Sequence, residues 1–285
     1  MSIIITKTWL LLFLILAYNP NLASASTVSK PNINENSKPV TSITLAPHLT
    51  ELVYSAGGGK NLLGISAYSN YPEEVQHKQI IGDAFHLNLE VIKALNPGVI
   101  FYWQDGTPVQ TIEQLKSLGF NLENIIIENL SDIPKAIEQI SQTLNTKPIE
   151  NAHKSFTAEL KRLKQQAHKP LTALIQFSDQ PIYTVNGNHW MSEAIEICGL
   201  SNVFTDMKQM SAAVTLESVV LKKPAVLVRL EPLKADSQLA QWPSIPAVKN
   251  NHVAVLEADH FTRPTLRILT AIQSLCEQVN LFQTD

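Results

Sequence analysis

The pattern of apolar and polar positions repeats once along the chain. Residues 88–100 read as a capping residue, Leu, Glu, a short helix, Pro and an apolar strand, and residues 215–227 follow the same order. Asn88 and Thr215 are good helix N-caps, and a Glu in the first turn suits the helix dipole. A proline ends such a helix, and the apolar run after it is typical of a buried parallel strand.

A second pair of similar segments precedes these two. Residues 50–61 begin Thr-Glu-Leu-Val and continue to a Gly and an Asn, and residues 192–202 begin Ser-Glu-Ala-Ile and do the same. Because both modules recur in the same order, the sequence predicts two related α/β lobes, over residues 41–147 and 169–285. We expect the ligand to bind in a cleft between the lobes.

A different pattern separates the lobes, over residues 148–168. Apolar residues recur there every three or four positions, charged residues fill the other faces, and Pro148 stands near the first turn. This predicts one amphipathic helix about 30 Å long. The expected fold class is therefore α/β, with two related lobes joined by a long rigid helix.

The N-terminal residues are typical of a targeting segment. Lys7 precedes the short apolar core Trp9–Ala17, and Ala23-Ser24-Ala25 fits a cleavage site. This pattern indicates a secretory signal peptide over residues 1–25. A membrane anchor is the weaker alternative, because the apolar core is too short to span about 30 Å of hydrocarbon. Residues 26–40 are polar and read as a flexible lead-in, so we expect export to the periplasm.

Composition and motifs exclude several classes of function. The net charge of −3 is small and unclustered, which argues against a nucleic-acid partner. No motif for a nucleophile, a zinc hydrolase or a redox dithiol is present, so an enzyme is disfavoured. Cys198 and Cys276 form an even count in a chain expected to be exported. That count suggests a disulfide, with two buried thiols as the alternative.

Aromatic residues gather in loops that are expected to follow strands. Loop aromatics are less easily assigned to the core than aromatics inside a periodic run. Together they suit a flat apolar ligand with a polar edge, which stacks on aromatic rings. The candidate ligand-binding aromatics are Tyr68, Phe85, Trp103, Tyr183, Trp190 and Phe261.

Glu90 and Glu217 occupy the same place in the two repeats. Helix capping alone would explain both residues. The functional alternative is a pair of exposed carboxylates, one on each lobe, that meet two identical partner subunits carrying Arg. Such charge pairs chiefly set orientation and association rate.

These segments resemble the cobalamin-binding branch of the helix-linked solute-binding proteins of bacterial ABC importers. The resemblance runs nearly end to end, over residues 42–279. Its most specific parts are Tyr-Ser-Asn-Tyr-Pro at 68–72, a strand that ends in Trp103, and Asp-His-Phe-Thr-Arg at 259–263, together with the cysteine pair. The resemblance implies two lobes with little hinge closure and a corrinoid such as cobalamin held between them.

The resemblance also implies roles for single residues. Tyr68, Trp103 and Tyr183 would contact the corrin ring or its nucleotide tail. Asp259 and Arg263 would bond the amides of the ring. Glu90 and Glu217 would dock on the permease dimer of the inner membrane. Cys198 and Cys276 would form a disulfide.

Two positions depart from the family pattern. The family has a cleft tryptophan in the loop 82–88, where this chain has Ala84 and Phe85. It has another in the loop 207–214, where this chain has Ser-Ala-Ala. Our hypothesis is that Phe85 and Trp190 replace these two tryptophans.

The sequence therefore predicts a monomer that captures a corrinoid in the periplasm and delivers it to an ABC permease. No cofactor and no protein metal site are expected, because the cobalt arrives inside the ligand. Three alternatives stay open: the same fold binding haem or a ferric siderophore, an exported enzyme that uses Asp259 in the cleft, and a metal-ion receptor. A haem binder would need an axial ligand, for which His86, His189 and His260 are candidates.

Overall fold

A computed structural model of the chain describes residues 38–149, 152–166 and 169–283. The expected signal peptide and most of the expected lead-in lie outside these residues. Within the described part, no helix combines the length and apolar character that a membrane crossing requires.

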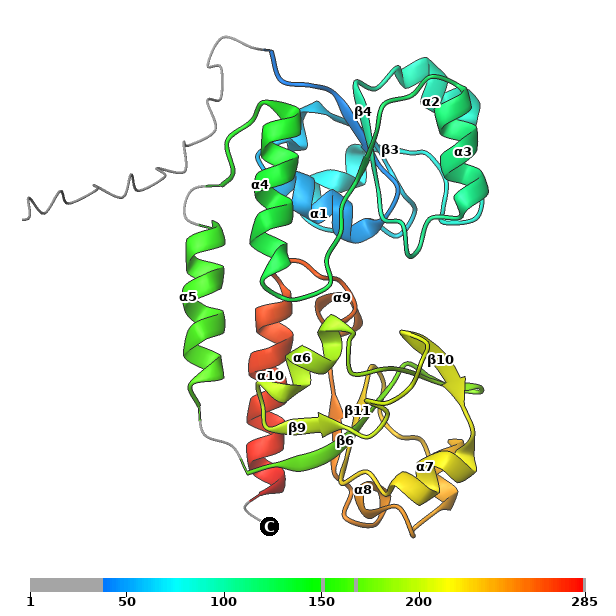
Figure 1. Cartoon of the computed structure of the whole chain (residues 1–285), viewed down its shortest axis with the longest axis vertical. Helices are drawn as coiled ribbons and strands as arrows, with labels where there is room; N and C mark the ends of the chain where they lie inside the picture. The colour runs from blue at the N-terminus through cyan, green and yellow to red at the C-terminus, as the bar shows by residue number, and fades with distance from the viewer. Residues whose placement is uncertain (1–37, 150–151, 167–168, 284–285) are drawn as a thin grey trace, which may run out of the picture. The chain divides into compact units, whose positions relative to one another are not determined.

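The first half of the chain forms a five-stranded sheet in which every pairing is parallel, in the order β3-β2-β1-β4-β5. The central strand β1 is fully buried, as its apolar pattern requires. Helices pack beside this sheet (Figure 1). The strands are β1 (Ser42–Thr44), β2 (Leu62–Ile65), β3 (Gln79–Ile80), β4 (Val99–Tyr102) and β5 (Leu122–Asn124), and the α-helices are α1 (Pro47–Ser55), α2 (Leu89–Leu95), α3 (Val109–Ser117) and α4 (Asp132–Leu144).

The second half contains two sheets. Four strands are parallel in the order β12-β11-β6-β9, and three are antiparallel in the order β10-β8-β7. The strands are β6 (Leu171–Gln176), β7 (Ser178–Asp179), β8 (Ile182–Val185), β9 (Leu200–Asn202), β10 (Ser211–Val214), β11 (Val226–Arg229) and β12 (Val253–Val255). The α-helices are α6 (Trp190–Glu196), α7 (Leu216–Lys222), α8 (Pro246–Lys249), α9 (Ala258–Phe261) and α10 (Ile268–Phe282), and short 3-10 helices cover Gly59–Asn61, Glu73–His77 and Gln238–Gln241.

The two parallel sheets share one topology, which confirms the internal repeat. Strand order β2-β1-β4-β5 in the first half corresponds to β9-β6-β11-β12 in the second. The caps agree as well: Asn88 accepts a hydrogen bond from the N–H of Val91, and Thr215 accepts one from Ser218. Both helices therefore start as the sequence predicts, and the fold is α/β with two related lobes.

The helix between the lobes is shorter than expected. The structure has α5 at Ala152–Lys164, and residues 148, 149, 165 and 166, which the prediction includes, are not helical. Ahead of α5, the N–H of Ile149 donates to the carbonyl of Ser55, which ties this residue to the end of α1. The helix itself is about 20 Å long. It packs against α4 of the first lobe and α10 of the second (Figure 1).

The largest apolar core runs through both lobes. Phe156 and Leu163 on α5, Leu144 on α4 and Leu275 on α10 all belong to it. Cys198 and Cys276 lie in the same core and form a disulfide. The described residues thus belong to one compact unit.

Candidate functional site

A pocket of about 440 Å³ lies at the carboxyl ends of the parallel strands of the first lobe. Segments that follow four strands of the sheet line it, at the edge where open α/β sheets bind ligands. Its volume falls in the range of small-molecule sites. These segments contribute residues 45–48 after β1, which include the start of α1, 66–68 after β2, 83–85 after β3, and Trp103, Gly106 and Thr107 after β4, while Thr262 and Arg263 reach it from the second lobe.

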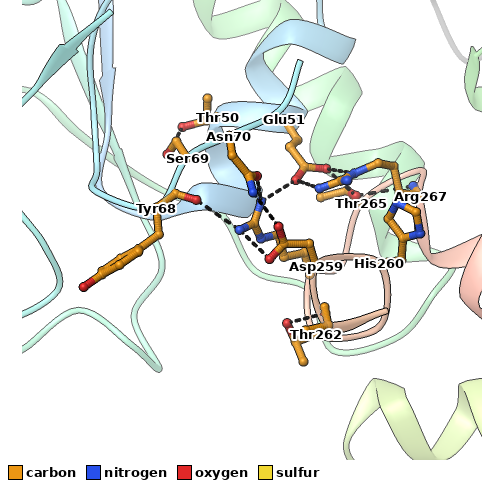
Figure 2. Close-up of polar contacts among 12 residues, drawn as sticks. Thr50, Glu51, Tyr68, Ser69, Asn70, Asp259, His260, Thr262, Thr265 and Arg267 are labelled. Carbon is orange, nitrogen blue, oxygen red and sulfur yellow. Dashed lines mark hydrogen bonds and ion pairs between the residues drawn. The ribbon is translucent and has the colours of Figure 1, made fainter. Parts of the chain in front are cut away.

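Tyr68 forms one wall of the pocket. Its backbone has φ 65°, a left-handed conformation that a bulky side chain rarely adopts, and its side chain is 80% exposed. Figure 2 shows its ring directed away from Glu51 and Asp259, while its carbonyl accepts a hydrogen bond from Arg263 at 3.0 Å. A strained backbone of this kind persists only where the surrounding contacts hold it in place, and such residues are concentrated at functional sites.

Phe85 lies at the tip of a loop built to expose it. The N–H groups of Phe85 and His86 both donate to Oδ1 of Asp83, at 2.8 Å each. These bonds lower the pKa of the Asp83 carboxyl. Gly82 opens the loop with φ 128°, and a Cβ there would lie 2.0 Å from the carbonyl oxygen of His86. Phe85 itself is 80% exposed, so its ring is free to contact a ligand.

Trp103 and His48 line the same pocket side by side. The two rings meet edge to face, with centroids 5.2 Å apart. Gly106 makes room for the indole, because a Cβ there would lie 2.3 Å from Cζ3 of Trp103. His48 is only 7% exposed, and burial, together with the charge of Arg263, lowers its pKa to about 3. The imidazole is therefore neutral at ordinary pH.

A buried cluster of charged and polar side chains, which we call the clasp, joins the two lobes beside the pocket (Figure 2). Glu51 on α1 is 3% exposed and accepts hydrogen bonds from Arg263 (3.0 Å), Thr265 (2.8 Å) and Arg267 (2.9 Å). Asn70 adds a bond to Asp259 at 2.6 Å. One carboxylate thus holds two arginines of the other lobe.

The clasp changes the expected roles of Asp259 and Arg263. Arg263 lines the pocket, but its two terminal nitrogens already contact Glu51, Asn70, the carbonyl of Tyr68 and Asp259, at 2.7–3.0 Å. Asp259 pairs with this arginine and does not line the pocket. Arg263 therefore orders the pocket wall, and Asp259 supports it from behind.

Three of the aromatics expected at the ligand lie elsewhere. Phe261 on α9 is 1% exposed and belongs to the core, so the expectation that it meets the ligand is corrected. Trp190, the first residue of α6, is 6% exposed, packs in the same core and does not line the pocket. It lines a different hollow, together with Met210 of the loop 207–214. Tyr183 on β8 is 41% exposed and also lies outside the pocket.

The three histidines considered as axial ligands do not line the pocket either. His86 is almost fully exposed and lies 3.7 Å from Asp83. His189 accepts a hydrogen bond from the N–H of Met191, and burial lowers its pKa to about 4. His260 lies 3.7 Å from Glu257. Among the described residues, no group of three or more His, Cys, Asp or Glu is arranged to hold a metal ion.

Two buried polar residues of the pocket, His48 and Thr107, were not singled out from the sequence. Neither residue belongs to a cluster of similar residues or to a recognised sequence motif. The signal that could have found them is position: like the loop aromatics, they follow β1 and β4 at the carboxyl edge of the sheet.

Glu90 and Glu217 occupy equivalent exposed positions in the first turns of α2 and α7. No hydrogen bond or ion pair joins either carboxylate to another residue in the described ranges. Their backbone helices are already capped by Asn88 and Thr215, so capping does not explain these carboxylates.

Comparisons with known proteins agree with this geometry. A family model described as "Periplasmic binding protein" matches residues 43–260. A vitamin B12-binding protein of Vibrio parahaemolyticus is 36% identical over 240 residues, covering 82% of this chain and 87% of that protein. The crystal structure of the periplasmic vitamin B12 binding protein BtuF of Vibrio cholerae has a TM-score of 0.79 at 30% identity, covering 87% of this chain and 100% of that one. A periplasmic heme-binding protein of Roseiflexus, RhuT, has a TM-score of 0.71 at 20% identity, covers 86% of this chain and 99% of that one, and shares the fold alone.

Proposed function

The chain belongs to the periplasmic binding protein family, and we propose that it captures cobalamin in the periplasm and delivers it to the permease of an ABC importer. The observation that carries the proposal is the pocket walled by Tyr68, Phe85 and Trp103. Rings on several sides suit a flat macrocycle, which gains contact area and stacking there. The relatives named vitamin B12-binding proteins support the choice of ligand. In this role the protein makes and breaks no covalent bond.

Titration of the purified protein with cyanocobalamin in a calorimeter tests this proposal. We expect one-to-one, sub-micromolar binding. Trp103→Ala is expected to weaken it roughly 10- to 100-fold, because a buried aromatic contact of about 1.5–3 kcal/mol is lost. Trp242→Ala is the matched control, since Trp242 is 43% exposed and does not line the pocket. This variant should bind cyanocobalamin with the same affinity as the unchanged protein.

Two outcomes would contradict the proposal. A folded protein that does not bind cyanocobalamin excludes the ligand, and a Soret band on addition of haem would then favour the haem alternative. Unchanged affinity after Trp103→Ala would place the ligand outside this pocket. Neither outcome touches the family assignment.

We also propose that the protein acts as an exported monomer. Residues 1–25 would direct export, as their pattern of a charged start, an apolar core and small residues indicates. All the residues that line the pocket belong to one chain. No second copy is needed for it.

Delivery to the permease is proposed to use Glu90 and Glu217. Their equivalent, exposed places on the two lobes suit a partner with two identical subunits, as a permease dimer has. In Figure 1 both helices, α2 and α7, lie on the side away from α5.

Charge reversal separates delivery from capture. Glu90→Arg combined with Glu217→Arg is expected to leave cobalamin affinity unchanged and to reduce uptake of labelled cobalamin by cells at least ~10-fold, because the charges now repel Arg on the permease. Glu277→Arg on α10 is the control, since Glu277 is exposed on another face. Normal uptake by the double variant would refute the docking role.

A further inference from the structure

Two polar side chains that line the pocket are mostly buried. His48 is 7% exposed and Thr107 is 8% exposed. Neither side chain forms a hydrogen bond with any residue of the described part. Their polar atoms keep contact with water through the open pocket. A ligand that displaces this water must replace its hydrogen bonds, because a polar group left without a partner is costly. Two such groups in one pocket therefore suit a ligand with polar groups at the matching places.

Both side chains are neutral and can donate as well as accept. The Thr107 hydroxyl has one proton and two lone pairs, and a neutral imidazole has one N–H and one bare nitrogen. Burial and the charge of Arg263 keep His48 uncharged by lowering its pKa. Trp103 fixes the plane of the imidazole through the edge-to-face contact. A primary amide, which also donates and accepts, is the matching group.

The charges around the pocket disfavour an anionic ligand. Arg263 is the only cation among the lining residues, and Glu51 and Asp259 already neutralise it. Asp83 is the other charged lining residue, and it is an anion. A carboxylate on the ligand would thus be taken out of water without a free cation, which is strongly unfavourable.

We propose that His48 and Thr107 bind uncharged amide groups on the rim of the ligand, and that the pocket thereby selects amide-rimmed corrinoids over tetrapyrroles with carboxylate rims. This inference rests on the proposed function and makes it more specific. It also predicts that haem binds poorly, because its propionates would find Arg263 occupied.

Replacements that remove only the hydrogen-bonding capacity test the two residues. Thr107→Val and His48→Leu are each expected to weaken cyanocobalamin binding roughly 10-fold in calorimetry, because a ligand amide is left unpaired. Thr107→Ser and His48→Asn keep a donor and an acceptor and should remain within ~3-fold of the unchanged protein. Urea unfolding of all four variants checks that each is folded.

A matched pair of ligands tests the selectivity. Dicyanocobyrinic acid carries carboxylates where its full amide carries amides, and the two are otherwise alike. The amide is expected to bind at least ~100-fold more tightly, since unpaired buried charges are costly. Haem is expected to bind no better than the acid.

The outcomes separate this inference from the proposed function. If the unchanged protein does not bind cyanocobalamin, the proposed function fails and the inference with it. If it binds cyanocobalamin, but Thr107→Val and His48→Leu bind it equally well or the acid binds as tightly as the amide, the inference alone is wrong.

Discussion

Replacing Glu51 with alanine is expected to lower the free energy of unfolding by about 3–5 kcal/mol, because two arginines lose their shared carboxylate in a buried place. The side chains of Arg263 and Arg267 are 10% and 17% exposed, so water cannot replace Glu51 fully. Thr265 loses its acceptor as well. Urea unfolding followed by circular dichroism measures the change.

Glu90→Ala is the control for this experiment. Glu90 is exposed, and its carboxylate has no bond or ion pair within the described residues, so its loss should shift stability by less than ~0.5 kcal/mol. Equal urea midpoints for Glu51→Ala and the unchanged protein would show that the clasp contributes nothing to stability.

The clasp could not be predicted from the sequence, because its members are distant along the chain. Glu51 is separated from Arg263 by 212 positions and from Arg267 by 216. Each residue lies in a short segment whose local pattern fits other roles: Glu51 stands inside a helix, and Arg263 closes a motif that resembles a ligand-binding one. Only the packing of the lobes brings these charges together.

The repeat was predictable for the opposite reason, since its signals are local. A cap, a Leu and a Glu fix the start of α2, and Pro97 follows its end. The same signals fix the start of α7. The two parallel sheets also have corresponding strand orders. The interlobe helix was overestimated because amphipathic spacing continues beyond Ala152–Lys164, although Ile149 bonds to Ser55 and is not helical.

The candidate site was predicted in part. Tyr68, Phe85 and Trp103 follow strands that end at one edge, so position alone places them together. Phe261 lies in the core because it is on the side of the single turn α9 that packs inward. Trp190 is buried because it starts α6 on the side of that helix that packs in the core. Sequence spacing does not show which way such residues point.

Removing the Cys198–Cys276 disulfide is expected to destabilise the protein by about 4–5 kcal/mol on the chain-entropy model. The bridge closes a loop with a sequence separation of 78, so it restricts the unfolded chain strongly. In the folded protein it joins α10 to the residue that follows the C-cap of α6, and both cysteines are buried. Urea unfolding of Cys198→Ala combined with Cys276→Ala measures the effect.

Reductant supplies the internal control for the disulfide. Dithiothreitol at a concentration that reduces the bridge should lower the urea midpoint of unfolding of the unchanged protein. The urea midpoint of the double variant should not change. Cobalamin affinity of the folded double variant should stay within ~3-fold, because neither cysteine lines the pocket and the local packing at that site is preserved. A double variant as stable as the unchanged protein would mean that the bridge does not restrict the unfolded chain as the chain-entropy model requires. A large loss of affinity, with the fold intact, would instead show that the tie between α6 and α10 positions the pocket across the clasp.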